Sequence, residues 1–388
     1  MIDKKQTVPA AVWCALMMFI LGASDALRGV FLPVFKNTFG LTQTQGSYII
    51  MFSYIGCMGF MFIGGYVSDR VNRKKFILAV SLMWMAALAA YVFTENYYVI
   101  LGAMIFSMGA SNMLSTTVNV ITPMIFLTPA VMVNIFNFAQ GAGMTVSQNV
   151  GGRFTSDIKY WHTANAIILG AAVISLIVLA FMKIPDVRTE DSGKKASYFD
   201  VFRNPACGWL ILIVIAYCIS EHGIQNWLTT YGSEHLGFTV EQSAKFLSVF
   251  FGGITIGRLL FAPLLNKIGV MKSLLIFSSA AAVLYVLGII LGRTGIYLIC
   301  AAGLGYSVMW PITVYLIGRY YPREQAGAAT GIISGFGTIS DVVFNAVFGR
   351  LTEAVGLGHS IIILPIASAA FAVFFICLYI RVPHPEGE

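Results

Sequence analysis

The segment Gly65-Tyr66-Val67-Ser68-Asp69-Arg70-Val71-Asn72-Arg73-Lys74-Lys75 separates two long apolar runs, at about 43–66 and 76–94. Each run is about long enough to cross the ~30 Å hydrocarbon core of a bilayer. The segment between them is short, charged and rich in turn-forming residues. It therefore predicts a tight hairpin loop at one membrane face.

The composition extends this interpretation to the whole chain. Of 388 residues, 58% are hydrophobic and only 11% are charged, which excludes an ordinary soluble domain. The net charge of +7 comes from the loops, so no nucleic-acid partner is expected. The six cysteines are dispersed and mostly inside apolar runs, and their spacing suggests neither disulfides nor a metal site.

The length and the apolar runs predict an all-α membrane protein with twelve transmembrane helices. The first run carries Asp25 and Arg28, so we do not expect it to be a cleavable signal. Lys and Arg residues are concentrated in alternate loops, and this places both termini on the cytoplasmic side of the cell membrane. The expected spans are 10–35, 43–66, 76–94, 97–127, 130–154, 163–183, 209–231, 241–265, 272–292, 295–318, 325–351 and 358–381.

A polar segment, 184–208, falls after the sixth span. We expect it to be a cytoplasmic linker, ending in a short interfacial helix, between two six-helix bundles at 1–183 and 209–388. A weak repeat with an offset of 197 residues supports two related halves. It places Asn266 on Asp69, Arg350 on Arg153 and His222 on Asp25.

The order Gly-x-x-x-Asp-Arg-x-(Gly/Asn)-Arg-Lys at 65–74 resembles the loop between the second and third helices of the major facilitator superfamily. The resemblance implies two pseudo-symmetric six-helix bundles and a cytoplasmic lock formed by Asp69, Arg70 and Arg73. The family usually has Gly where this chain has Asn72, and Asn also tolerates the positive φ of a turn. The alternative is a basic loop that only sets topology.

Asp25 lies near the middle of the first span, where a charge costs roughly 2.5–3.5 kcal/mol and usually has a function. Arg28 is three residues further on and shares its helix face, so the two can pair. We expect Asp25 to carry a proton under the influence of Arg28, with Glu221 in the seventh span as a second coupling carboxylate. The alternative is a buried structural ion pair.

Polar and aromatic residues recur at helical spacing in several other spans. Amides, hydroxyls and indole rings suit a hydroxyl-rich solute, although the same groups also form hydrogen bonds between helices. His222 could relay protons or simply bond a backbone carbonyl. The predicted solute ligands are Asn112, Ser115, Asn119, Asn137, Gln140, His222, Gln225, Trp310 and Asp341.

The first span, Ser24 to Phe35, and the element Phe136-Asn137-Phe138-Ala139-Gln140 are similar to the fucose:proton symporter group of the superfamily. In that group an Asp at the position of Asp25 is protonated during transport. The fourth span departs from the pattern, because Ser115 replaces a second carboxylate four residues before Asn119. This replacement leaves the coupling mechanism and the substrate open.

Together these features predict a monomeric secondary transporter, not an enzyme, that carries a sugar or polyol with protons by alternating access. Its solute site is expected between the two bundles near the bilayer midplane. No cofactor is expected, and no Walker-type motif for an ATP-driven motor is present. The alternatives are a transporter of a small organic anion such as a sugar acid, with Arg28 on its carboxylate, and a drug exporter with a more apolar cavity.

Overall fold

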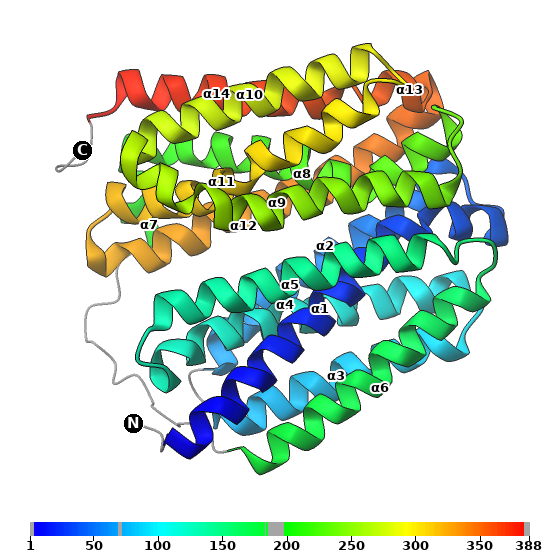
Figure 1. Cartoon of the computed structure of the whole chain (residues 1–388), viewed down its shortest axis with the longest axis horizontal. Helices are drawn as coiled ribbons and strands as arrows, with labels where there is room; N and C mark the ends of the chain where they lie inside the picture. The colour runs from blue at the N-terminus through cyan, green and yellow to red at the C-terminus, as the bar shows by residue number, and fades with distance from the viewer. Residues whose placement is uncertain (1–3, 69–71, 183, 185–197, 384–388) are drawn as a thin grey trace. The chain divides into compact units, whose positions relative to one another are not determined.

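The computed structural model describes residues 4–68, 72–182, 184 and 198–383, and all regular secondary structure in these ranges is helical (Figure 1). All twelve predicted long helices are present. The first six are α1 (Lys4–Phe39), α2 (Gln43–Ser68), α3 (Arg73–Phe93), α4 (Tyr97–Ile125), α5 (Pro129–Gly152) and α6 (Lys159–Phe181). A five-residue helix, α7 (Tyr198–Phe202), precedes α8 (Ala206–Glu234), α9 (Val240–Ile268), α10 (Val270–Ile290), α11 (Ile296–Tyr320) and α12 (Arg323–Val355). The final predicted span is divided into α13 (Leu357–Ser360) and α14 (Ile363–Arg381).

The chain forms two compact units, residues 1–191 and 192–388. In the first unit α1 packs on α5, α2 on α4, and α3 on α4 and α6. In the second unit the corresponding pairs are α8 with α12, α9 with α11, and α10 with α11 and α14. The helices α2 and α9 begin 197 residues apart, as do α3 and α10. The same packing scheme is therefore used twice.

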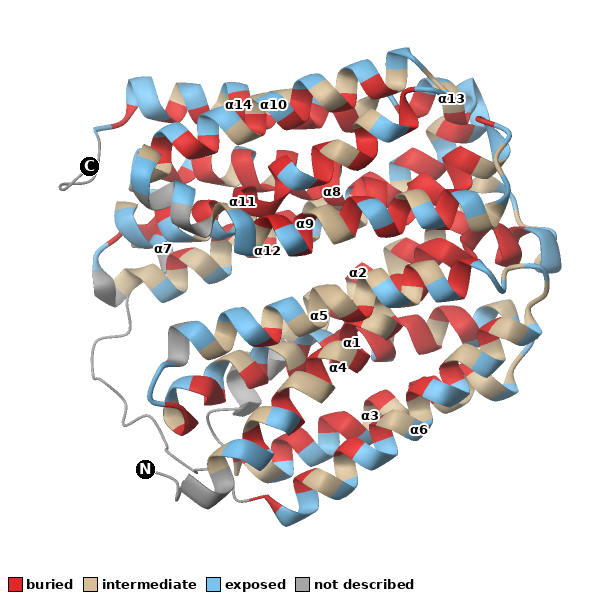
Figure 2. Cartoon of the chain, in the orientation of Figure 1, coloured by how far each residue is buried: buried red, intermediate tan, exposed pale blue. Residues whose placement is uncertain are grey.

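Ten helical segments of the described chain are long and apolar enough to cross a membrane. They include α6, a strongly apolar helix with many exposed positions (Figure 2). Its side chains Ile167, Ile174 and Ile177 are all more than half exposed. Exposed aliphatic rows of this kind are suited to contact with lipid rather than with water.

The turn before α3 differs from the prediction for Asn72. Asn72 has φ −53°, so it does not adopt the positive φ expected of it. Its side chain instead accepts a hydrogen bond from the backbone N–H of Lys75, which makes it the N-cap of α3. Its counterpart in the second unit, Gly269, does have a positive φ, of 89°. The two units therefore start equivalent helices with different turns.

The short helix α7 is fixed to its own unit by two hydrogen bonds. The Tyr321 hydroxyl donates to the carbonyl of Val201 at 3.0 Å. The side-chain amide of Asn204 donates to the carbonyl of Tyr320 at 2.7 Å. These contacts hold the entry to α8 against the end of α11.

Candidate functional site

The first polar centre surrounds Asp25 in α1. The Ser111 hydroxyl of α4 donates to Asp25 Oδ2 at 2.9 Å. Asp25 Oδ1 is buried and has no hydrogen-bond partner among the described residues. Because one carboxylate oxygen is held and the other is unsatisfied, this group is available to bind a proton or a hydroxyl donor.

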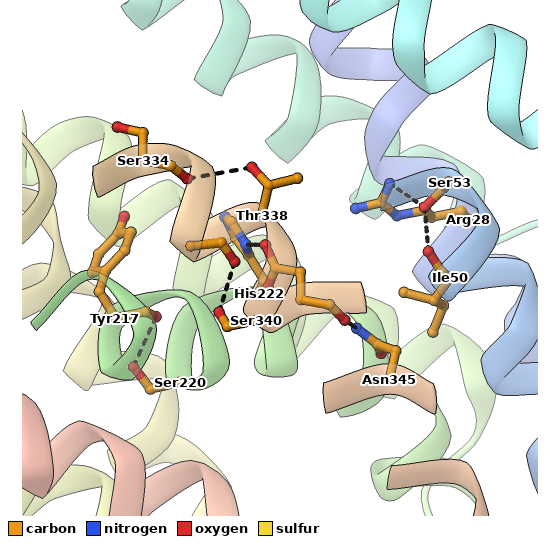
Figure 3. Close-up of polar contacts among 12 residues, drawn as sticks. Arg28, Ile50, Ser53, Tyr217, Ser220, His222, Ser334, Thr338, Ser340 and Asn345 are labelled. Atoms are coloured by element: carbon orange, nitrogen blue, oxygen red, sulfur yellow. Dashed lines mark hydrogen bonds and ion pairs between the residues drawn. The ribbon is translucent and has the colours of Figure 1, made fainter. Parts of the chain in front are cut away.

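Arg28 is almost completely buried, at 3% exposure. Its Nη1 donates to the Ser53 hydroxyl of α2 at 2.9 Å, and Ser53 in turn donates to the carbonyl of Ile50 (Figure 3). The guanidinium also lies over the ring of Tyr54, 4.6 Å from its centroid. Asp25 and Arg28 each form a hydrogen bond with a serine of another helix, and Arg28 also acts electrostatically on the carboxylate, so their predicted pairing stays a prediction.

The predicted ligands of α4 and α5 differ in burial. Asn112 is exposed, whereas Ser115, Asn119, Asn137 and Gln140 are half-buried. Asn119 Oδ1 has no hydrogen-bond partner among the described residues.

A glycine brings α5 close to α1. A Cβ added at Gly22 would overlap the carbonyl oxygen of Gln140. The absence of a side chain at Gly22 therefore lets α5 approach α1 one turn before Asp25.

Of the three predicted lock residues, only Arg73 is described. It is buried, at 8% exposure, and its Nη1 lies 3.1 Å from Met124 Sδ. Asp69 and Arg70 lie outside the described residues. The lock therefore stays a prediction.

The second polar centre joins α8 and α12. His222 Nδ1 lies 2.8 Å from Asp341 Oδ2, a hydrogen-bond distance from imidazole to carboxylate. Asp341 is 2% exposed and His222 29%. The thiol of Cys218, one turn before His222, lies beside the pair, and one donor atom from each of the three residues lies within 4.8 Å of the others.

Asp341 is held in place by a chain of hydrogen bonds behind it. The Asn345 side-chain amide donates to the Asp341 carbonyl at 2.8 Å. The indole N–H of Trp227 donates to Asn345 Oδ1 at 2.9 Å. Figure 3 shows Asn345 on its helix next to the His222 contact. These bonds tie α8 to α12 and fix the backbone that carries Asp341.

An aromatic group adjoins His222. The ring of Tyr217 is stacked on Trp310, with centroids 5.3 Å apart, and meets His222 edge-on at 6.3 Å. The predicted ligand Trp310 is half-buried, and Gln225 is buried at 7% exposure. This unit therefore combines flat apolar surfaces with amide and carboxylate groups.

Glu221 is also buried, at 7% exposure, and its Oε2 has no hydrogen-bond partner among the described residues. Glu221 lies close enough to His222, Arg258 and Asp341 to interact electrostatically with them. Arg258 lies on α9, so the acidic and basic groups of this centre come from three helices.

The residues of these centres that were not predicted as site residues include Ser111, Ser53, Tyr54, Tyr217 and Cys218. The first three are ordinary helix residues whose importance comes only from the neighbours that they touch. Cys218 could have been found, because Cys218 and His222 are four residues apart and so lie on one helix face.

Comparison with known proteins agrees with the fold. The sequence model of the Major Facilitator Superfamily matches residues 14–301. A glucose/galactose transporter of Brucella abortus biovar 1 (strain 9-941) is 22% identical over 382 residues, covering 93% of this chain and 91% of the relative. A crystal structure of a variant of the nucleoside transporter NupG matches with a TM-score of 0.79 at 12% identity, covering 96% of this chain and all of that one. A variant of the E. coli fucose:proton symporter FucP matches with a TM-score of 0.69 at 16% identity, covering 96% of this chain and 98% of that one.

Proposed function

The chain belongs to the major facilitator superfamily, and we propose that it carries a neutral sugar or a related polyol together with protons. The superfamily consists of transporters rather than enzymes, so the chain is a secondary transporter whose substrate is a small molecule. The proposal adds the solute class, the coupling ion and the residues responsible. Alternating access is the mechanism by which such carriers work.

The observation that carries the proposal is the state of Asp25. It is a carboxylate in a transmembrane helix, held by Ser111 through one oxygen and unsatisfied at the other. An unpaired carboxylate oxygen in such a place is costly, and a proton that binds there removes the charge. Asp25 is therefore the proposed proton carrier, with the Arg28 charge acting on it and Glu221 as the second coupling group.

The solute class follows from the other polar groups. Amides on α4 and α5 and the carboxylate–imidazole pair on α8 and α12 can donate to and accept from sugar hydroxyls. The stacked Tyr217 and Trp310 rings offer a flat surface of the kind that packs on the apolar face of a sugar ring. The glucose/galactose transporter from Brucella abortus, similar over almost the whole chain, supports a sugar.

The test is transport by the purified chain in proteoliposomes with an imposed pH gradient, acidic on the side from which sugar is offered. We expect glucose or galactose to accumulate against its gradient. Asp25→Asn should abolish this accumulation but leave downhill exchange, because Asn resembles the protonated acid in its hydrogen bonding. Asp157→Asn is a matched control, because Asp157 is partly exposed, at 45% of its side chain, in the turn between α5 and α6. If the Asp25→Asn variant still accumulates sugar, Asp25 is not the proton carrier, and Glu221 or Asp341 must take that role.

A second candidate, transport of a small organic anion such as a sugar acid, is favoured by the buried guanidinium of Arg28. Arg binds carboxylates through a fork of N–H donors that Lys does not reproduce. If the solute is an anion, Arg28→Ala should abolish binding and Arg28→Lys should restore it only in part. If the solute is a neutral sugar, binding should persist in both variants. Competition of uptake by neutral sugars and by their acids separates the same two candidates in the wild-type chain.

A further inference from the structure

The Cys218–His222–Asp341 cluster contains a thiol, a group that sugar binding does not require. A thiol, an imidazole and a carboxylate meet between α8 and α12, with one donor atom from each within 4.8 Å of the other two. A thiol has little use in hydrogen bonding to sugar hydroxyls, because sulfur is a weak donor and a weak acceptor. We propose that Cys218, His222 and Asp341 form a binding site for a divalent transition metal of the Zn²⁺ type.

The three ligand types match this metal class. Zn²⁺ binds Cys sulfur at about 2.3 Å and His nitrogen and carboxylate oxygen at about 2.0–2.2 Å, in a tetrahedron whose ligand atoms are therefore roughly 3.3–3.8 Å apart. The present separations, from 2.8 Å between His222 and Asp341 to no more than 4.8 Å, bracket this range, so the His222–Asp341 contact has to open to admit the ion. Magnesium and calcium prefer oxygen ligands only, and the thiol disfavours them.

The surrounding helices provide room for the thiol and fix the carboxylate. A Cβ at Gly337, one turn before Asp341 on α12, would stand only 2.8 Å from Cys218 Sγ. The Asn345 side chain fixes the backbone of Asp341 from behind. Asp341 Oδ1 is buried and has no hydrogen-bond partner among the described residues, so one oxygen of a nearly inaccessible carboxylate is still unsatisfied.

The site is also accessible. His222 is 29% exposed, whereas Cys218 is buried at 4% exposure. Three protein ligands leave the fourth position of a tetrahedral ion for water, as in open zinc sites. The imidazole is therefore the ligand of this cluster that is most open to an incoming ion.

Binding has a defined proton balance. The Cys218 thiol loses its proton to solvent when sulfur becomes a ligand, and the imidazole binds in its neutral form. Protons therefore compete with the metal. The affinity for Zn²⁺ should therefore fall as the pH is lowered. An ion held only by an ionised carboxylate would not show this dependence, because no thiol proton is lost when it binds.

The test uses the purified full-length chain in detergent, titrated with Co²⁺ as a spectroscopic substitute for Zn²⁺. We expect a thiolate-to-cobalt charge-transfer band that Zn²⁺ removes by displacement. Cys218→Ser should abolish the band, while Cys300→Ser, which replaces another buried cysteine of the same unit, should retain it. No band in the wild-type protein, or a band that survives in Cys218→Ser, would overturn the site.

A second variant tests the site independently, in case Cys218→Ser does not fold. His222→Gln changes a partly exposed side chain and should weaken Zn²⁺ binding at least about tenfold, because even loss of a residue behind a metal ligand costs 10–100-fold. Thermal unfolding without metal confirms that each variant is folded. Unchanged Zn²⁺ affinity in His222→Gln would show that the imidazole is not a ligand of the metal and would overturn the three-ligand site.

One consequence rests on the proposed function. Because His222 and Asp341 are also proposed solute ligands, Zn²⁺ should inhibit sugar uptake, and a chelator should reverse the inhibition. The cobalt band does not depend on transport, so its absence would remove the metal site and leave the sugar proposal intact. A normal cobalt band in a chain that transports no sugar would remove the sugar proposal and leave the metal site intact.

Discussion

Ser111 of α4 donates a 2.9 Å hydrogen bond to the carboxylate of Asp25 in α1, 86 positions away in the sequence. A hydroxyl can donate to an ionised carboxylate or accept from a protonated one. The same contact can therefore persist whether or not Asp25 carries a proton. We therefore expect Ser111 to position the carboxylate throughout the proposed cycle.

The first prediction concerns this contact. Ser111→Ala should lower proton-driven sugar accumulation by up to about tenfold, since a lost hydrogen bond costs about 0.5–1.5 kcal/mol. Ser111→Thr, which keeps the hydroxyl, should restore most of it. Downhill exchange should change little in either variant, so the two assays together separate coupling from folding.

Thr117→Val is the matched control on α4, because among the described residues the Thr117 hydroxyl bonds only the carbonyl of Met113 in its own helix. Accumulation that is normal in Ser111→Ala would show that Asp25 needs no support from α4.

The second prediction concerns helix packing in the first unit. Gly22→Ala places a methyl group against the Gln140 carbonyl, and backbone cannot rotate away as a side chain can. Overpacking of this kind costs about 1–3 kcal/mol, so the thermal unfolding temperature in detergent should fall. Sugar binding should weaken with it, because Gln140 moves.

Gly102 gives the control within the same unit. An added Cβ there meets nothing within 4 Å, and Ala is favoured over Gly inside a helix by up to about 1 kcal/mol. Gly102→Ala should therefore be neutral or slightly stabilising. Equal destabilisation by both changes would mean that close approach of α1 and α5 is not what Gly22 provides.

The third prediction concerns the hydrogen bond from Trp227 to Asn345. Asn345→Ala leaves a buried indole N–H without its acceptor and should destabilise the chain by about 1–3 kcal/mol. Adding Trp227→Phe removes the stranded donor. The double variant should therefore lose less stability than the sum of the single changes, as measured by denaturation of all four proteins in one detergent. Additive losses would contradict a direct coupling between these side chains.

The sequence predicted the helices well because hydrophobic length is a local property. The span expected at 43–66 is helix α2 (Gln43–Ser68), and the span expected at 272–292 is α10 (Val270–Ile290). The first helix starts earlier than expected, at Lys4 rather than near 10, since polar residues at a helix end do not add to an apolar run.

The contacts between helices could not be predicted in the same way. Helical spacing suggested Arg28 as the partner of Asp25, because it compares residues on one helix only. The structure brings Ser111 to Asp25 and Ser53 to Arg28 from two other helices. His222 and Asp341, 119 positions apart, were both expected to bind solute, but their contact depends on the packing of α8 against α12.

The last prediction concerns solute recognition on α5. Asn137 and Gln140 are three residues apart, on one face of the helix, and both are half-buried. If they bind sugar hydroxyls, Ala at either position should weaken binding by up to about tenfold, because one hydrogen bond of about 0.5–1.5 kcal/mol is lost. Proton uptake should remain, since Asp25 is unchanged.

Asn149→Ala is the matched amide control, because Asn149 lies on the opposite side of α5 from Gln140 and contacts Arg153. Equilibrium binding of galactose to each variant gives the comparison, and normal affinity in both Asn137→Ala and Gln140→Ala would assign this row to helix packing alone.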